Sequence, residues 1–204
     1  GSYGKLMKAY YAKQDAEKLS GKGDTSQKLT LMKTSADSLK KSADALNDSS
    51  LWEKKKIKKK DEKTGEEIEV EDYDWDKITK AVKSFVEDYN DVVKEAGESN
   101  TKDVLRNASW MTGMTDKNSN MLAKIGITIG KGNKLELDED ALKQADISSL
   151  KTIFTGYNSF VSKISQKATG ISNAANRASA TYTNNGTYSK TDSSLTSSKI
   201  DKEV

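Results

Sequence analysis

The side chains with the best spacing for chemistry are three carboxylates, Glu87, Asp88 and Asp91, which lie within about one turn of a predicted helix. A carboxylate pair can transfer protons when one of its members is held away from water. On the same helix, however, Phe85 and Tyr89 already occupy the buried side. We therefore interpret the three acids as a solvated helix face and keep an enzyme built on carboxylates as the minor alternative.

The residue types that are missing narrow the chemistry further. The 204 residues include no His, no Cys and no Pro. Without His and Cys, the chain cannot build Ser-His-Asp or Cys-His catalytic groups, disulfides, or metal sites with nitrogen or sulfur ligands. We predict that it is not an enzyme, that it holds no metal and no cofactor, and that it has no small-molecule substrate. The absence of Pro is typical of a chain dominated by long helices.

Two blocks of opposite charge follow each other between residues 51 and 75. Six lysines surround Ile57, and five acids surround Ile68 and Val70, with Lys63-Thr64-Gly65 between the blocks. A basic strand beside an acidic strand is self-complementary, which predicts a charged, solvent-exposed β-hairpin. The lysine block alone would indicate a nucleic-acid or anionic-membrane site, but the acidic block neutralises most of its field. Disorder is the remaining alternative.

The overall charge and hydropathy argue against two classes of partner. The chain carries 34 Lys+Arg against 31 Asp+Glu, a net charge of +3, which is not typical of a dedicated nucleic-acid binder. No apolar run approaches the ~20 residues of a membrane span. We expect no nucleic-acid partner and no membrane span.

A few other patterns have a structural and a functional interpretation. Trp52 and Trp75 flank the charged hairpin and are expected to clamp its base onto the helices. For these two residues and Trp110, a sugar-binding aromatic platform is the alternative, because exposed aromatics mark binding sites. Gly130-Lys131-Gly132-Asn133 lacks the spacing of a phosphate-binding loop. Asp138-Glu139-Asp140 is better explained as the start of a helix than as a calcium site.

Apolar residues at steps of three and four predict the helices that position these side chains. The predicted helices cover 3–20, 26–48, 74–96, 101–112, a short turn around 120–124, and 139–145, with a second hairpin at 125–137. Helix 26–48 has an N-cap among Asp24, Thr25 and Ser26, and Gly113 is expected to end helix 101–112. Two of the helices carry heptad seams, formed by Leu29, Met32, Ala36, Leu39, Ala43 and Leu46, and by Ile78, Val82, Phe85, Tyr89, Val92 and Ala96.

The longest predicted helix begins at Ser148 or Ser149 and follows heptads without interruption to Tyr182. Its seam is expected to pack on helix 74–96. Towards the end the seam thins to alanine, which buries little area, so the distal half is expected to contact a partner chain. The expected partner-binding residues are Ile164, Ala168, Ile171, Ala175, Ala178 and Tyr182.

These elements together predict the fold class and the domain organisation. The fold is mainly α, an elongated helical bundle or coiled coil with two small β-hairpins at about 51–75 and 125–137. Apolar residues make up only 34% of the chain and charged residues 32%, which favours a narrow core. Residues 1–182 are expected to form a single elongated helical domain with the charged hairpin inserted at 51–75, and residues 183–204 a polar, flexible tail.

Short phrases between residues 74 and 182 occur in a specific order. They are FVEDYNDV at 85–92, Gly126-Ile127, NKLELDEDAL at 133–142, and IFTG at 153–156. This order resembles the helical core of the flagellar filament cap family, the hook-associated protein at the filament tip, in which a long C-terminal helix also follows. The resemblance covers roughly half of the chain. The large variable domains of that family are absent, and only the charged hairpin stands in their place.

The resemblance implies a structural, assembly-type protein of the bacterial flagellum. Its partners would be copies of itself, in a homo-oligomer, and flagellin or other flagellar axial proteins, all bound by helix packing. It would be secreted and extracellular. Proteins that are exported unfolded tend to lack cysteine, and this chain contains none. The alternative is a helical protein–protein interaction module of another bacterial secreted or surface system.

Overall fold

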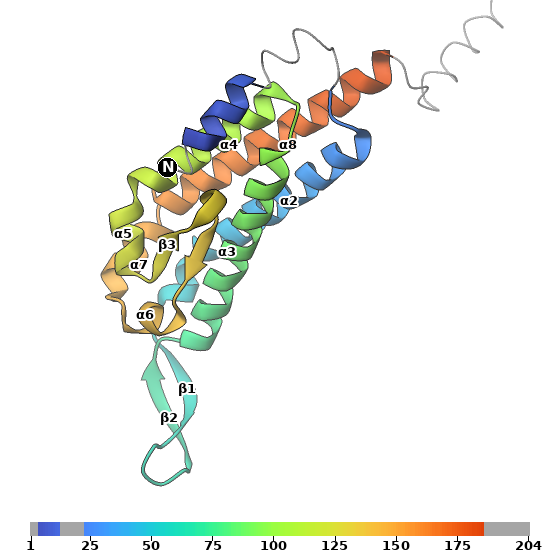
Figure 1. The fold of residues 1–204 in the computed structure, drawn as a ribbon. Helices are drawn as coiled ribbons and strands as arrows, with labels where there is room; N and C mark the ends of the chain where they lie inside the picture. The colour runs from blue at the N-terminus through green and yellow to red at the C-terminus, as the bar shows by residue number, and fades with distance from the viewer. Residues whose placement is uncertain (1–3, 13–22, 186–204) are drawn as a thin grey trace, which may run out of the picture.

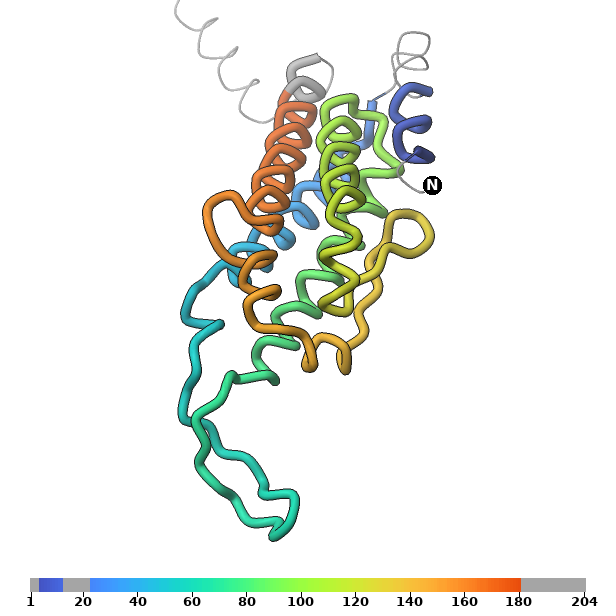
Figure 2. Tube along the Cα trace, turned by 90° about the vertical axis from the view of Figure 1, so that its left-hand side faces the viewer, coloured from blue at the N-terminus to red at the C-terminus, as the bar shows by residue number. Residues whose placement is uncertain are grey.

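The computed structural model describes residues 4–12 and 23–185, with side chains as far as Ala180. Four long helices, α2 (Ser26–Leu46), α3 (Trp75–Gly97), α4 (Lys102–Lys117) and α8 (Phe160–Asn185), form an elongated bundle. Residues 4–12 form a further helix beside α4 (Figures 1 and 2). A hairpin projects from the end of the bundle opposite to the end of α8 (Figure 1). The predicted fold class, mainly α with two small β-hairpins, is confirmed.

The helices α2 and α3 begin where their sequences predict and bury the predicted seams. The Thr25 hydroxyl accepts a hydrogen bond from the Lys28 N–H and so caps α2, and Asp74 caps α3 in the same way. All residues of both predicted seams are buried. Along α3 the seam is at most 1% exposed, so a single stripe provides most of its packing.

The charged segment forms the predicted hairpin from β1 (Lys55–Lys60) and β2 (Glu67–Asp72). The strands are antiparallel, with Lys56 opposite Glu71 and Lys58 opposite Glu69. The hairpin turns at Gly65, whose φ of +71° suits glycine. It leaves the bundle through the short 3-10 helix η1 (Ser49–Trp52).

An aromatic cluster anchors the base of this hairpin. The indole N–H of Trp52 donates to the Leu46 carbonyl at 2.7 Å, and its ring stacks on Phe154 at 5.6 Å. Phe85 contacts Phe154 and Phe160 edge to face. Trp75 packs on the core from the other arm of the hairpin. Trp52 is 1% exposed, so its role is to fix the hairpin rather than to present a binding platform.

The helix α4 is longer than its sequence predicts. Gly113 does not end it, and α4 continues to Lys117, where α5 (Ser119–Lys124) follows. The prediction was wrong because a single glycine destabilises a helix by only about 1 kcal/mol. Burial of the side chains of Met111, Thr112 and Thr115 on either side of Gly113 offsets this destabilisation.

The second predicted hairpin is also present. It consists of β3 (Ile127–Ile129), the short turn η2 (Lys131–Asn133) and β4 (Leu135–Leu137), and α6 (Glu139–Gln144) follows it. The side-chain amide of Asn90 on α3 holds β4 by donating to the Leu135 carbonyl and accepting from the Leu135 N–H. The Asp138 carboxylate caps α6 by accepting from the Ala141 N–H, as expected for an acid at a helix start.

The long C-terminal helix is interrupted, contrary to the prediction. It consists of α7 (Ile147–Phe154) and α8, joined by residues 155–159. Gly156 has a φ of +102°, and the side chain of Asn47 binds both its N–H and its carbonyl. Tyr157, which fits the heptad spacing, is 92% exposed. The spacing continues through the turn by coincidence, and the backbone conformation of Gly156 redirects the chain.

The packing partner of α8 also differs from the prediction. α8 packs mainly along α2 and α4, whereas its contact with α3 is minor and includes the Phe85–Phe160 ring pair at its start. A heptad seam shows which face of a helix is buried but does not identify the neighbour. α8 continues to Asn185, beyond Tyr182, and residues 186–204 of the predicted tail lie outside the described residues.

Candidate functional site

Most side chains predicted to bind a partner lie inside the bundle. Those with at most 1% of their surface exposed are Ile164, Ala168, Ile171 and Ala175. They belong to the core that α8 forms with α2 and α4. Ala178 is half-buried against the same core, and the side chain of Tyr182 lies outside the described residues. Along most of α8, the chain's own helices therefore cover the predicted seam.

Two carboxylates join α2 to α8 in a repeated arrangement. Asp37 accepts a hydrogen bond from the Ser172 hydroxyl, and Asp44 accepts one from the Ser165 hydroxyl, both at 2.6 Å. Both acids and both serines are seven residues apart, so the contact recurs after two turns. Burial alone would raise the pKa of each acid, but hydrogen bonds from a lysine on α2 and from the serine outweigh it and lower the pKa.

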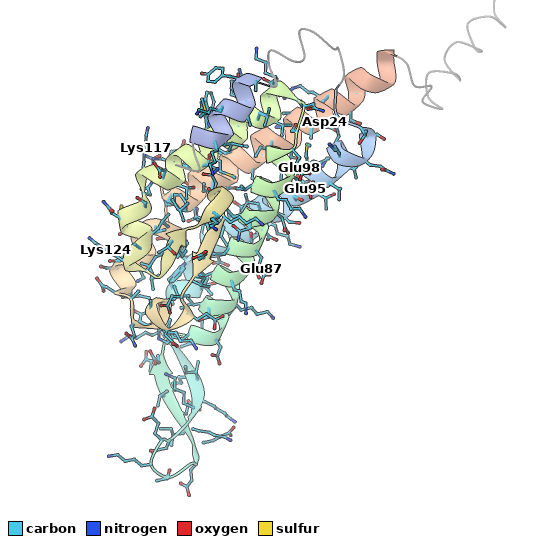
Figure 3. The ribbon with its side chains drawn as sticks, viewed as in Figure 1. Asp24, Glu87, Glu95, Glu98, Lys117 and Lys124 are labelled. Atoms are coloured by element: carbon cyan, nitrogen blue, oxygen red, sulfur yellow. The ribbon has the colours of Figure 1, made fainter. Side chains whose placement is uncertain are left out.

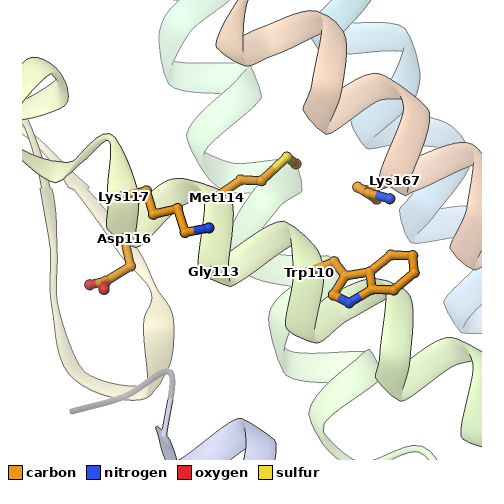
Figure 4. A pocket seen from close by; sticks show the side chains of 6 residues that line it. All are labelled: Trp110, Gly113, Met114, Asp116, Lys117 and Lys167. Atoms are coloured by element: carbon orange, nitrogen blue, oxygen red, sulfur yellow. The ribbon is translucent and has the colours of Figure 1, made fainter.

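The exposed aromatic side chain of Trp110 marks a different surface. Trp110 lies on α4 and is 52% exposed. With Gly113, Met114 and Lys117 of α4 and Lys167 of α8, it lines a shallow groove of about 270 Å³. Figure 4 shows the indole of Trp110 facing Lys167 across the space between the two helices. We call this surface the Trp110 groove.

The Trp110 groove is basic as well as aromatic. The Lys167 Nζ lies 4.2 Å from the centre of the indole ring, and the Arg106 guanidinium lies 5.8 Å from it, both within the range of a cation–π interaction. The helical repeat brings further bases to the same faces of α4 and α8. The exposed or half-buried bases on these faces are Lys102, Arg106, Lys117, Lys163, Lys167 and Arg177.

The groove has fewer acidic than basic side chains around it, and one of these acids already forms ion pairs with the bases. Asp103 lies 2.8 Å from Arg106 and 3.9 Å from Arg177, and Asp116 borders the groove. The groove can therefore bind a segment that offers an apolar side chain to the indole and carboxylates to the cations.

The sequence indicated Trp110 only within the alternative of an aromatic platform, and not as a partner-binding residue. Its position falls outside the apolar stripe of Val104, Ala108 and Met111 that packs α4 on the core, so the helical repeat does place it on the outer face. A large aromatic outside the seam of a helix is thus the signal that could have identified it.

The three carboxylates considered for chemistry remain on the outer side of α3. Glu87 and Asp91 are exposed, whereas Asp88 is half-buried. Burial raises the pKa of Asp88, the neighbouring charges of Asp91 and Glu87 raise it further, and a hydrogen bond from Ser42 opposes the change. Figure 3 shows Glu87 and Glu95 along α3 and Glu98 directly after it, well apart from Lys117 and Lys124. In the part of the chain that the structure describes, no group of three or more acids could hold a metal ion.

The comparisons with known proteins bear on the segment that contains the Trp110 groove. The family model described as flagellar hook-associated protein 2 C-terminus matches residues 99–203. This chain belongs to that family. The matched segment begins just before α4 and includes α4 and α8, so both walls of the groove lie within it.

Family membership gives the chain a coarse role, that of a flagellar cap-type structural protein. The family is located at the tip of the flagellum, outside the cell, and is structural rather than enzymatic. The FVEDYNDV phrase at 85–92 precedes the matched segment and remains a resemblance. Neither the comparison with curated proteins nor the comparison with solved structures gave a significant match. Within residues 4–12 and 23–185, no helix has the length and apolar character to cross a membrane.

Proposed function

We propose that this chain is a secreted structural subunit of the flagellar filament cap type, which associates with copies of itself and with flagellin or another flagellar axial protein. The observation that carries the proposal is the Trp110 groove, which lies within the family segment and is open to solvent. Its function is geometric, because it holds neighbouring subunits in place without making or breaking bonds.

The exposed indole gives the groove enough free energy to anchor a partner. A tryptophan side chain that is 52% exposed offers about 100 Å² for burial. At about 25 cal/mol per Å², covering this area contributes about 2.5 kcal/mol, or on the order of fiftyfold in affinity. Tryptophan and arginine are the residues most enriched among those that dominate interface energies, and Trp110 and Arg106 adjoin each other here.

The distal end of α8 is the second contact in this proposal. The seam residues before it are enclosed by α2 and α4. Ala178 is less enclosed, and from there the helix runs on to Asn185. The predicted partner contact of α8 is therefore proposed to begin at Ala178 and to include Tyr182.

The experiment compares Trp110→Ala with a matched variant, Tyr157→Ala. Both remove one exposed aromatic side chain, and Tyr157 is 92% exposed on the turn before α8. Sedimentation measures self-association, and titration calorimetry measures the affinity for purified flagellin. Trp110→Ala should weaken at least one of the two associations by on the order of fiftyfold, while Tyr157→Ala should match the wild type. Equal binding by all three proteins would exclude the Trp110 groove, and failure of the wild type to bind either partner would overturn the proposed function.

A further inference from the structure

The hairpin of β1 and β2 has two open edges. In the described part of the chain each sheet has only two strands, so no strand lies beside the outer edge of β1 or of β2. The hairpin extends away from the helices in both views of the molecule (Figures 1 and 2). An open edge is a template for pairing with another strand unless charges prevent it.

The two open edges carry opposite charges. On one face of the hairpin the residues opposite each other are Lys56 and Glu71, Lys58 and Glu69, and Lys60 and Glu67. Every lysine of this face belongs to β1, and every glutamate belongs to β2. The two β1 edges of two copies would oppose lysine with lysine, and two β2 edges would oppose glutamate with glutamate, which is unfavourable. A β1 edge and a β2 edge attract each other.

The backbone hydrogen bonds place these same residues at the open edges. The Asp61 N–H donates to the Glu66 carbonyl at 2.9 Å, which fixes the alternation of the antiparallel ladder. Every second residue of β1, counted back from Asp61, therefore points its backbone N–H and carbonyl groups towards β2. The residues between them, Lys56, Lys58 and Lys60, point their N–H and carbonyl groups outward, as Glu67, Glu69 and Glu71 do on β2.

We propose that the hairpins of neighbouring copies pair head to tail, with β1 of one copy beside β2 of the next, and so extend the sheet from chain to chain. The proposal rests on the self-association in the proposed function and names one surface for it. The outward backbone groups of the lysines then meet those of the glutamates, and each junction repeats the Lys–Glu register of the hairpin itself.

This pairing also sets the orientation of the subunits. Antiparallel strands at the junction require neighbouring hairpins to point the same way, so the helical bundles stand side by side rather than end to end. Such a head-to-tail contact closes into a ring or continues as a filament.

On the other face of the hairpin lie Ile57, Ile68 and Val70; Ile57 and Val70 are half-buried and Ile68 is 39% exposed. The junction would join these apolar residues into a continuous strip.

A chain with exchanged charges tests the proposal. The exchanged variant carries Lys56→Glu, Lys58→Glu, Lys60→Glu, Glu67→Lys, Glu69→Lys and Glu71→Lys. Its hairpin keeps three pairs of opposite charge, and its own junctions are attractive. In a mixture with the wild type, however, every mixed junction brings together like charges. Native mass spectrometry of the mixed full-length chains counts the subunits of each kind in every oligomer.

The wild type and the exchanged variant should each self-associate but should not co-assemble, with mixed junctions weaker by on the order of tenfold or more. Random mixing of the two chains would overturn the hairpin junction and leave the proposed self-association standing. A monomeric wild type would overturn both. Circular dichroism checks that the exchanged variant folds. If it does not, the variant Lys58→Glu with Glu69→Lys is mixed with the wild type instead, and reduced co-assembly is again the expected result.

Discussion

The buried carboxylate of Asp24 holds the start of α4, and removing it should destabilise the whole bundle. Asp24 is 4% exposed, just before α2, and Figure 3 labels it near Glu98. Its two oxygens accept hydrogen bonds from the Ser99 hydroxyl at 2.8 Å, the Asn100 N–H at 2.7 Å and the Thr101 hydroxyl at 2.5 Å. Thr101 itself makes no side-chain cap on α4. The negative charge at this helix start is favourable as well.

The size of the effect follows from the three donors that Asp24→Ala leaves without an acceptor. A lost hydrogen bond to a charged group, or a buried donor without a partner, costs roughly 1–3 kcal/mol. Because the three share one site, we expect about 3–4 kcal/mol in total, or a fall in Tm of about 10 °C. Asp24→Asn keeps one carbonyl oxygen and should cost about 1 kcal/mol.

Urea unfolding followed by circular dichroism measures these changes in the free energy of unfolding. The matched control is Asp138→Ala, which removes an exposed capping carboxylate with a single acceptor bond from the Ala141 N–H at 3.1 Å. It should cost about 1 kcal/mol. If Asp24→Ala costs no more than this control, then Asp24 does not hold α4 in place and the reasoning is refuted.

Two further predictions concern a turn and the pH dependence of stability. Gly126→Ala should destabilise the fold by about 2–4 kcal/mol, because the φ of Gly126 is +90° and an added Cβ would lie 2.6 Å from the Asp138 carbonyl oxygen. The control Gly132→Ala should cost about 1 kcal/mol, because Gly132 has a φ of +67° but open space around it. Equal costs of the two variants in urea unfolding would contradict this prediction. Because the pKa values of Asp37 and Asp44 are lowered in the folded state, the contribution of these acids to folding stability is present above their ordinary pKa of 3.8. This stability is lost as the pH falls below that value. The double variant Asp37→Asn, Asp44→Asn should therefore lose stability less steeply in thermal melts below about pH 4 than the wild type does, and identical slopes would refute the contribution of these acids.

Local sequence was sufficient for the elements whose structure depends on near neighbours. The seams of α2 and α3, the caps at Thr25 and Asp138, and both hairpins were predicted and are present. Apolar spacing and capping chemistry act within a few residues, and the charges of β1 and β2 specify their own pairing.

Features that depend on distant parts of the chain were not predicted. The turn at Gly156 is held by Asn47, and the partner of Asp24 lies at residues 99–101, so neither can be derived from spacing. The same limit applies to α8, whose heptads indicated a buried face but not its neighbours α2 and α4. The exposed position of Trp110 follows from the helical repeat, but its contact with Lys167 follows only from how α4 packs on α8.

The most direct test of a cap-type role is to delete the gene for this chain and measure flagellin in the culture medium beside electron micrographs of the cells. Unassembled flagellin should accumulate in the medium and filaments should be absent. The wild-type gene should restore filaments, whereas a gene carrying Trp110→Ala should restore them poorly. Normal filaments in the deletion strain would contradict the cap-type role and favour an interaction module of another secreted or surface system.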